Sequence, residues 1–225
     1  MGLIATETGG GKDRPLIQEG VHLAVCYLIA DLGTHHSEMF DKDAHKVVIG
    51  WEIPGERGTF HIDGKDQDLP LVASKTFTLS LHKKAALRQV LEAWRGQAFT
   101  DEELKGFDLK AVLGAPCQLQ IMHTKKGEKT YANIGAVMPL MKGVQAPQGE
   151  TAHQWFSLSE GVDLPDHLPE WVRKEIEASK EWQAMLRAGG TDDTTTGVDT
   201  LEESHPFPPP TDADMAEQDE ENLPF

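Results

Sequence analysis

SKTFTLSLHKKAALRQVLEAWRG, residues 74–96, changes its hydrophobic period halfway along. From Ser74 to Leu81, apolar and polar side chains alternate, which predicts a β-strand. From Lys83 to Arg95 the apolar residues recur every three or four positions, which predicts an amphipathic helix, and Gly96 is typical of the residue that ends a helix. The stretch therefore predicts a strand that leads into a helix.

Two strands are predicted before this stretch. Residues 20–30 have β-branched and aromatic residues in alternation, and Lys46–Ile53 has a similar pattern that is closed by Pro54 and Gly55. The segments Gly33–His45 and Glu56–Pro70 are polar. We expect the first to be a loop and the second to be a loop or a short excursion.

Two further strands are predicted after the helix. Thr100–Glu103 matches a capping box and predicts a second, short helix. Gln118–Thr124 and Thr130–Leu140 are predicted strands, joined by a hairpin loop at Lys125–Lys129. The predicted order is three strands, a helix and two strands.

This order is that of the OB-fold, a five-stranded Greek-key barrel with a helix between its third and fourth strands. A sandwich and a split barrel are alternatives, and the place of the helix favours the barrel. We therefore expect a mainly β protein with some helix, in which residues 18–142 form an OB-fold-like domain. Residues 1–17 are expected to form a flexible N-terminal arm.

The C-terminal third is expected to hold one helix and a disordered tail. Residues 143–188 are predicted to form an extension with a helix at Leu168–Leu186, and Pro169 lies in its first turn, where proline is tolerated. A helix this short cannot bury a core of its own, so its apolar face should pack on the barrel or on a partner. Residues 189–225 contain eleven acidic residues and no Lys or Arg, which predicts a disordered acidic tail.

The formal charge of -16 is unevenly distributed. Residues 1–145 hold 17 Lys and Arg against 18 Asp and Glu, a net of -1, whereas residues 146–225 hold 4 against 19, a net of -15. Cys26 and Cys117 lie in apolar runs typical of buried thiols, so a reducing cytoplasm is expected. No apolar run approaches the roughly 18 residues of a membrane span, and the N-terminus lacks a signal-peptide core, so we expect no membrane.

The last eleven residues, MAEQDEENLPF, combine an acidic run with an apolar end. Acidic tails commonly aid solubility, which needs no apolar end. With this ending the chain resembles the single-stranded DNA-binding proteins of bacteria and their phages, whose disordered tails end in an acidic tip closed by a hydrophobic residue, Pro and Phe. The matching residues here are Asp219, Glu220, Glu221, Leu223, Pro224 and Phe225, with Glu prominent where the family prefers Asp.

The resemblance implies a protein that coats and protects single-stranded DNA in replication, recombination and repair. It implies that the tip recruits replication or recombination proteins, and it leaves homo-oligomerisation open. The chain departs from the familiar bacterial sequence pattern, which favours a bacteriophage origin and the cytoplasm of the bacterial host cell. We also expect the acidic tail to compete with DNA for the cations of the barrel.

In an OB-fold, nucleic acid crosses the second and third strands between the loops that join strands one to two and four to five. Lysines there would contact phosphates, and aromatic rings would stack on bases. Trp51 lies on the same predicted face as Val47 and Ile49, so the alternative to a stacking role is that it is buried in the core. The expected DNA-binding residues are Lys42, His45, Lys46, Trp51, Lys75, Thr76, Thr78, Lys125, Lys126, Lys129 and Tyr131.

Signals for an enzyme are weak. His35 and His36 are adjacent rather than at metal-ligand spacing, and Asp63, Asp66 and Asp68 lack the spacing of a calcium loop. We expect no catalytic residue, metal or cofactor. The competing function is an OB-fold adaptor that binds proteins of the replication and recombination machinery without binding DNA, and a small nuclease is a third class.

Overall fold

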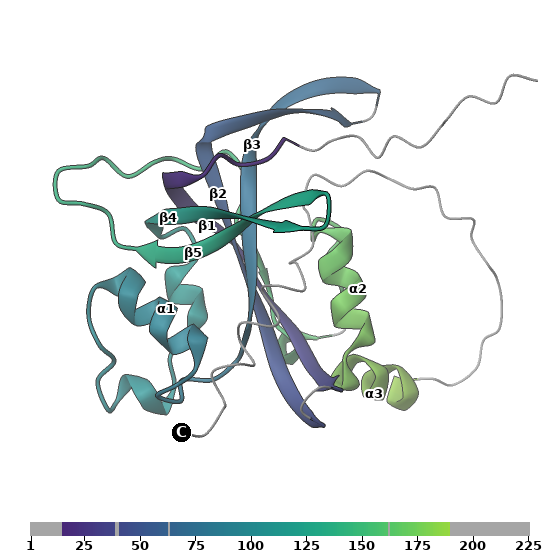
Figure 1. The fold of residues 1–225 in the computed structure, drawn as a ribbon. Coiled ribbons are helices and arrows are strands. Elements are labelled where there is room, and N and C mark those ends of the chain that lie inside the picture. Colours follow the sequence, from purple (N-terminus) through teal and green to yellow (C-terminus); the bar gives the residue numbers. More distant parts are fainter. Residues whose placement is uncertain (1–14, 39–40, 63, 162, 190–225) are drawn as a thin grey trace, which may run out of the picture.

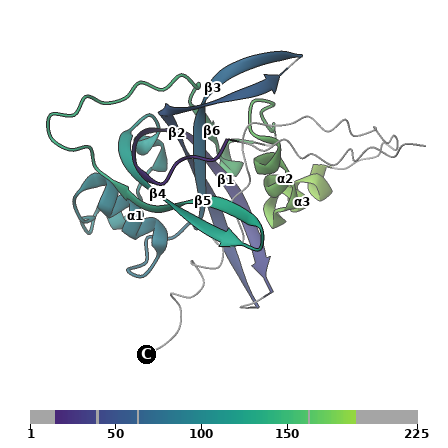
Figure 2. The ribbon, with the colours of Figure 1, turned by 45° about the horizontal axis from the view of Figure 1, so that its top comes forward.

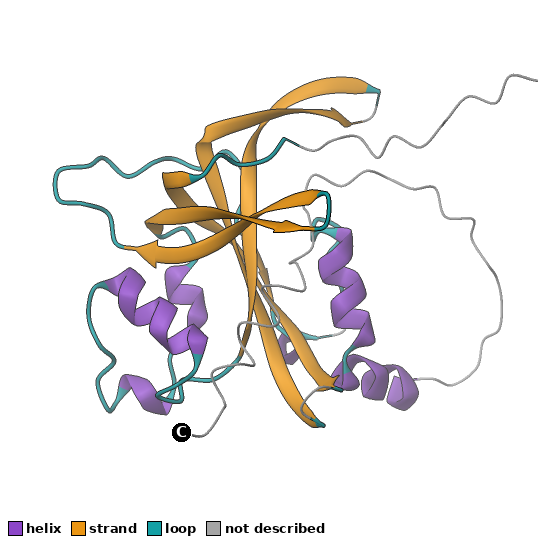
Figure 3. Ribbon diagram, viewed as in Figure 1, coloured by secondary structure: helices purple, strands orange, loops and turns teal. Residues whose placement is uncertain are grey.

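The computed structural model describes residues 15–38, 41–62, 64–161 and 163–189. Its centre is a curled, antiparallel half-barrel of five long strands, with a short sixth strand added to β1 (Figures 1 and 3). The strands are β1 (Gly20–Ser37), β2 (Lys42–Ile62), β3 (Lys65–Thr78), β4 (Pro116–Lys126), β5 (Lys129–Met138) and β6 (Gln154–Phe156). The helices are α1 (Ala86–Arg95), α2 (Glu170–Ala178) and α3 (Lys180–Gly189), with 3-10 turns η1 (Glu103–Lys105), η2 (Leu109–Val112) and η3 (Leu158–Glu160).

The strand β1 belongs to both halves of the curled sheet. Its first residues, Gly20–Val25, pair with β4, and the residues from Val25 to Ser37 pair with β2. The strand order is β3-β2-β1-β4-β5, and α1 lies between β3 and β4 in the chain. The predicted mainly β architecture, with five strands and a helix after the third, is confirmed.

The predicted loop at Gly33–His45 is wrong. β1 continues to Ser37, and β2 begins at Lys42, so most of this segment forms an antiparallel ladder. A register irregularity between Asp31 and Gly33, with Gly33 at φ 75°, lets the strand bend without ending. Polar side chains of this segment are accommodated in a strand because carboxylates of the C-terminal helices lie within ion-pair distance of them.

Most of Glu56–Pro70, where we expected a loop or a short excursion, belongs instead to the strands β2 and β3. Residues 57–62 pair with Lys65–Pro70, which makes a long extension of the β2–β3 hairpin. The ladder shifts register between Ile53 and Arg57, and this irregularity accommodates Pro54 and Gly55. A hairpin that projects into solvent buries little of either face, so it lacks the alternation by which a strand is predicted.

The inside of the half-barrel is filled by one apolar cluster. Trp51 is completely buried there, and its ring lies 5.7 Å from that of Trp94 on α1, centroid to centroid. Gly96 ends α1 at φ 67°, as predicted. Cys26 and Cys117 are free thiols in this cluster, and burial raises the pKa of Cys26 to about 12.

The predicted capping box at Thr100 is confirmed. The Thr100 N–H donates to the Glu103 carboxylate at 2.8 Å, and the Glu103 N–H donates to the Thr100 hydroxyl at 3.3 Å. The helix that follows is only the single turn η1.

The helices α2 and α3 lie beside β1 on the outer face of the sheet (Figure 2). A second apolar cluster lies between these helices and the strands β1 and β2. Val172 and Ile176 of α2 are completely buried in this cluster. We expected the C-terminal helix to pack on the barrel or on a partner, and the structure shows it on the sheet, but the predicted single helix is two helices. The break falls at Ser179, which has extended backbone at ψ 154°, and its hydroxyl accepts the Trp182 N–H at 3.2 Å to begin α3.

A buried carboxylate fixes the connection between β5 and β6. Glu52 has no exposed surface and accepts the N–H groups of Glu150 and Thr151, each at 2.7 Å. Arg57 pairs with Glu150 and with Asp68, so the same connection is also tied to the β2–β3 hairpin.

The folded domain includes a residue before its predicted first residue, 18. Ile17 packs in the core of the half-barrel, and its carbonyl accepts a hydrogen bond from the His123 ring at 2.8 Å. The rest of the predicted arm, residues 1–14, lies outside the described residues. Within the residues that the structure describes, none of the helices has the length and apolar character needed to cross a membrane.

Candidate nucleic-acid interface

The β4–β5 hairpin has one buried and one outward face. Ile121 and Ile134 pair across the two strands and are buried in the core. The pairs Thr124–Tyr131 and Lys126–Lys129 lie on the opposite, outward face, because side chains alternate along a strand. The predicted lysine loop is shorter than expected, since the ladder continues to Lys126 and Lys129 and leaves a two-residue turn.

Tyr131 therefore lies next to two lysines on one face. Its side chain is half-buried, while Lys126 and Lys129 are exposed. Behind Tyr131, the Asn133 side-chain amide donates to the Thr124 hydroxyl at 3.0 Å, which fixes both polar groups across the hairpin. Lys125 pairs with Thr130 and projects from the other face.

The β3 residues of the predicted site lie in different environments. Lys75 is half-buried, and its ammonium group donates to the Ile134 carbonyl on β5 at 3.5 Å, so it bridges the two edges of the half-barrel. Thr78 is exposed at the end of β3. Thr76 is buried opposite Val48, on the face that the C-terminal helices cover, so the structure contradicts its assignment as a DNA contact.

The structure also contradicts a stacking role for Trp51. The side chain is completely buried in the half-barrel and packs against Trp94, so neither face of its ring is accessible to a base. Trp51 is therefore a core residue. This was the alternative indicated by its position on the same face as Val47 and Ile49.

The β1–β2 hairpin is engaged by α3 rather than open. The His45 ring donates from Nε2 to the Asp31 carboxylate at 2.6 Å, and its Nδ1 lies 3.7 Å from the Glu181 carboxylate. Lys180 forms an ion pair with Asp43, and hydrogen bonds from Lys180 and His36 hold the pKa of Asp43 below its usual value. These carboxylates offset the positive charge that we expected to meet phosphates.

The structure thus divides the expected residues into two groups. Lys126, Lys129 and Tyr131 share one face, whereas Lys42, His45 and Lys46 lie at the end of the β1–β2 hairpin, which points in another direction (Figure 1). Sequence reasoning missed Asn133, although alternation from Tyr131 places it on the same face.

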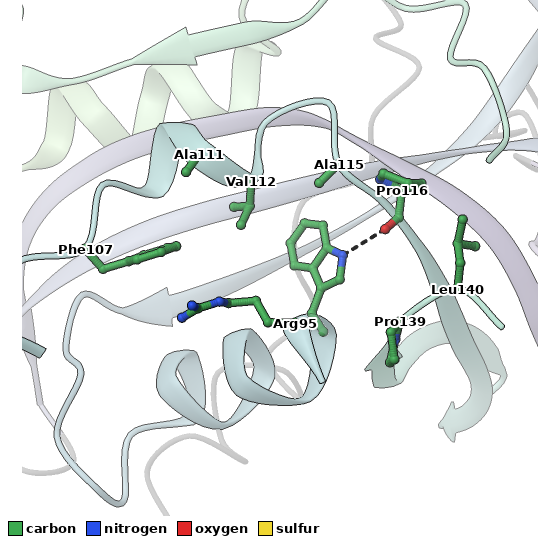
Figure 4. A pocket seen from close by; sticks show the side chains of 9 residues that line it. Arg95, Phe107, Ala111, Val112, Ala115, Pro116, Pro139 and Leu140 are labelled. Carbon is green, nitrogen blue, oxygen red and sulfur yellow. Dashed lines mark hydrogen bonds between the residues drawn. The ribbon is translucent and has the colours of Figure 1, made fainter. Parts of the chain in front are cut away.

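A separate hollow of about 410 Å³ lies beside α1 (Figure 4). Arg95 stacks on the rings of Phe99 and Phe107, 4.6 and 5.2 Å from their centroids, and forms an ion pair with Glu103. Since its one cation is already paired, the hollow offers an apolar surface rather than a phosphate site. Its lining consists of Trp94, Arg95, Phe107, Ala111, Val112, Ala115, Pro116, Pro139 and Leu140.

Within the described ranges, no group of three or more His, Cys, Asp or Glu residues is arranged to hold a metal ion. The predicted tip residues, Asp219–Glu221 and Leu223–Phe225, lie outside those ranges. No protein-family model and no curated protein sequence matches this chain.

Proposed function

We propose that the protein binds single-stranded DNA through the outward face of the β4–β5 hairpin, and coats and protects it during replication, recombination and repair. The observation that carries this proposal is the position of Tyr131 beside Lys126 and Lys129 on one face. We also propose that the half-barrel is an OB-fold, because β1 is shared between both halves and α1 follows β3.

Each side chain has a separate role in this binding. A base stacked on an aromatic side chain contributes about 1–3 kcal/mol and does so for any base, so Tyr131 supplies affinity without sequence preference. Lys126 and Lys129 contact neighbouring phosphates. Each phosphate contact to a single strand contributes about -0.7 to the slope of log K against log salt, so a surface with few lysines predicts a modest salt dependence.

The acidic segment after α3 has the second role in this proposal. Its acidic residues cannot contact phosphate, and its Leu223, Pro224 and Phe225 supply an apolar end. We propose that this tip recruits replication or recombination proteins to the coated strand.

Fluorescence anisotropy with a labelled oligo-dT tests the proposal. Tyr131→Ala should lower affinity roughly 5- to 150-fold, which corresponds to the loss of one stacked base. The double variant Lys126→Ala/Lys129→Ala should weaken binding and reduce the salt slope by about 1.4. Lys105→Ala, on η1, is the control, because it also removes an exposed lysine and should leave affinity unchanged.

An adaptor function is the second candidate, and one observation favours it. Many cations of the folded part already pair with carboxylates, including Arg57, Arg88, Arg95, Lys174 and Lys180, which leaves a small cationic surface. An adaptor shows no saturable oligo-dT binding at about 50 mM salt, where phosphate contacts are strong. That result would exclude the DNA-binding proposal.

A further inference from the structure

Three apolar side chains are exposed on the sheet beyond Tyr131. Val21 and Leu23 on β1 and Met122 on β4 have 57%, 38% and 46% of their surface exposed. Val21 pairs with Gln120 and Leu23 with Gln118, while the intervening Leu119 and Ile121 point into the core. These side chains therefore lie on the outward face that also carries Tyr131.

The two parts of the outer face of the sheet differ in how they are covered. Where β1 pairs with β2, the face is covered by α2 and α3 and forms a buried cluster, and β6 extends the sheet beside β1. Val21, Leu23 and Met122 belong to neither buried cluster. An apolar sheet face that solvent reaches in this way is typical of a binding surface.

Met122 joins these apolar residues to the hairpin. It pairs with Asn133, and on the outward face this pair is the one next to Thr124–Tyr131. A Cβ atom at Gly135 would lie only 2.6 Å from Met122 Cε, so the absence of a side chain there allows the thioether to lie against the β5 backbone. The result is a low, polarizable surface beside the tyrosine ring, of a kind that packs well against aromatic groups.

We propose that this face extends the single-strand interface from Tyr131 across Met122 to Val21 and Leu23. This inference rests on the proposed function. Bases that follow the one on Tyr131 pack on the Met122 thioether and on the two aliphatic side chains. The side-chain amides of Asn133, which is opposite Met122, and of Gln120, which is opposite Val21, can form hydrogen bonds with base edges.

Single-stranded DNA fits this face better than a second copy of the chain does. The lysine pair Lys126 and Lys129 lies at one end, and the outward β4 and β5 residues between it and Leu23 carry no charge, so the face matches a strand with a charged backbone and apolar bases. The carboxylate of Glu19 lies beside this path and accepts the His123 N–H at 2.7 Å. A stable protein interface covers about 800 Å² on each partner around an apolar core, and three partly exposed side chains supply little of that. A protein partner would also bury the Asn133 and Gln120 amides.

Methionine oxidation tests the proposal on the unmodified protein. Met122 and Met141 are both exposed, Met141 at 62%, and hydrogen peroxide should oxidise both. Saturating oligo-dT should slow oxidation of Met122 at least fivefold and leave Met141 unchanged, as followed by peptide mass spectrometry. Equal rates with and without DNA would overturn the inference. Protection of Met122 without DNA that increases with protein concentration would instead identify a second copy as the occupant and overturn it as well.

A charge-matched pair of variants gives a second readout. Met122→Glu should weaken oligo-dT binding at least tenfold, while Leu186→Glu on α3, where the leucine is 55% exposed, should not change it. Met122→Ala, which adds no charge, should weaken binding about threefold, and circular dichroism checks that each variant is folded. If Tyr131→Ala weakens binding and all three of these variants bind normally, the inference fails and the proposed function stands. If the wild-type protein does not bind oligo-dT, both fail.

Discussion

Glu181 joins the C-terminal helices to the β1–β2 hairpin through one side chain. Its carboxylate accepts the Thr34 N–H at 2.6 Å and the Thr34 hydroxyl, and it faces the His45 ring. Burial alone would raise the pKa of Glu181, but the hydrogen bonds from Thr34 outweigh it and hold the pKa below the usual value.

This lowered pKa predicts a pH dependence of stability. Because the folded pKa lies below the unfolded value of about 4.3, Glu181 stabilises the fold above that pH, and the contribution is lost as pH falls through the folded pKa. Glu181→Gln should therefore be less stable than the wild type at neutral pH, with a difference that shrinks toward about pH 3. Urea unfolding across this range measures it, and Glu177→Gln, an exposed position on α2, is the control. A difference that stays constant with pH would contradict this role.

Residues whose roles depend on near neighbours could be predicted from the sequence. Gly96 follows directly from the helix that it ends, and the Thr100–Glu103 capping box lies within four residues. Glu52 could not be predicted, because the N–H groups that it accepts belong to residues 98 and 99 positions away. Thr76 is a similar case. Alternation along β3 predicted that its side chains lie on two faces, but it could not predict that the C-terminal helices, which are distant in sequence, cover the face that carries Thr76.

At the scale of elements, the β1–β2 hairpin packs directly against the break between α2 and α3. Gly33 has φ 75°, and a Cβ atom there would lie 2.5 Å from the Ser179 Cβ. Ser179 is itself completely buried and begins α3. This contact explains why a single predicted helix is two, since the chain turns where it meets the strand.

Substituting Gly33 tests this fit. Gly33→Ala should destabilise the protein by about 2–5 kcal/mol, because a left-handed backbone disfavours alanine by about 1–2 kcal/mol and the new methyl group also displaces Ser179, which costs about 1–3 kcal/mol. Gly127→Ala is the matched control, because Gly127 has φ 64° and open space around it, so only the backbone cost remains. Urea unfolding gives both values. Equal losses would show that α2 and α3 are not held at this contact.

Across the whole molecule, charge is divided between a nearly neutral half-barrel and an acidic end. Residues 1–145 sum to -1, while residues 190–225 contain eleven acidic residues and no Lys or Arg. Because so few lysines lie on the proposed interface, a segment of this charge tethered to α3 is a strong local competitor for them. We expect it to reduce DNA affinity at low salt without any specific docking site.

Deletion of residues 201–225, which removes eight acidic side chains, should therefore strengthen oligo-dT binding at low salt. The gain should fall as salt rises, because screening weakens the competition between the acidic segment and DNA phosphates. A full-length variant with these eight residues changed to Asn or Gln separates charge from length and should bind as tightly as the deletion variant. Anisotropy titrations from about 20 to 200 mM salt measure all three proteins. Equal affinity of the wild type and the deletion variant at the lowest salt would show that the acidic segment and the DNA do not compete for the same lysines.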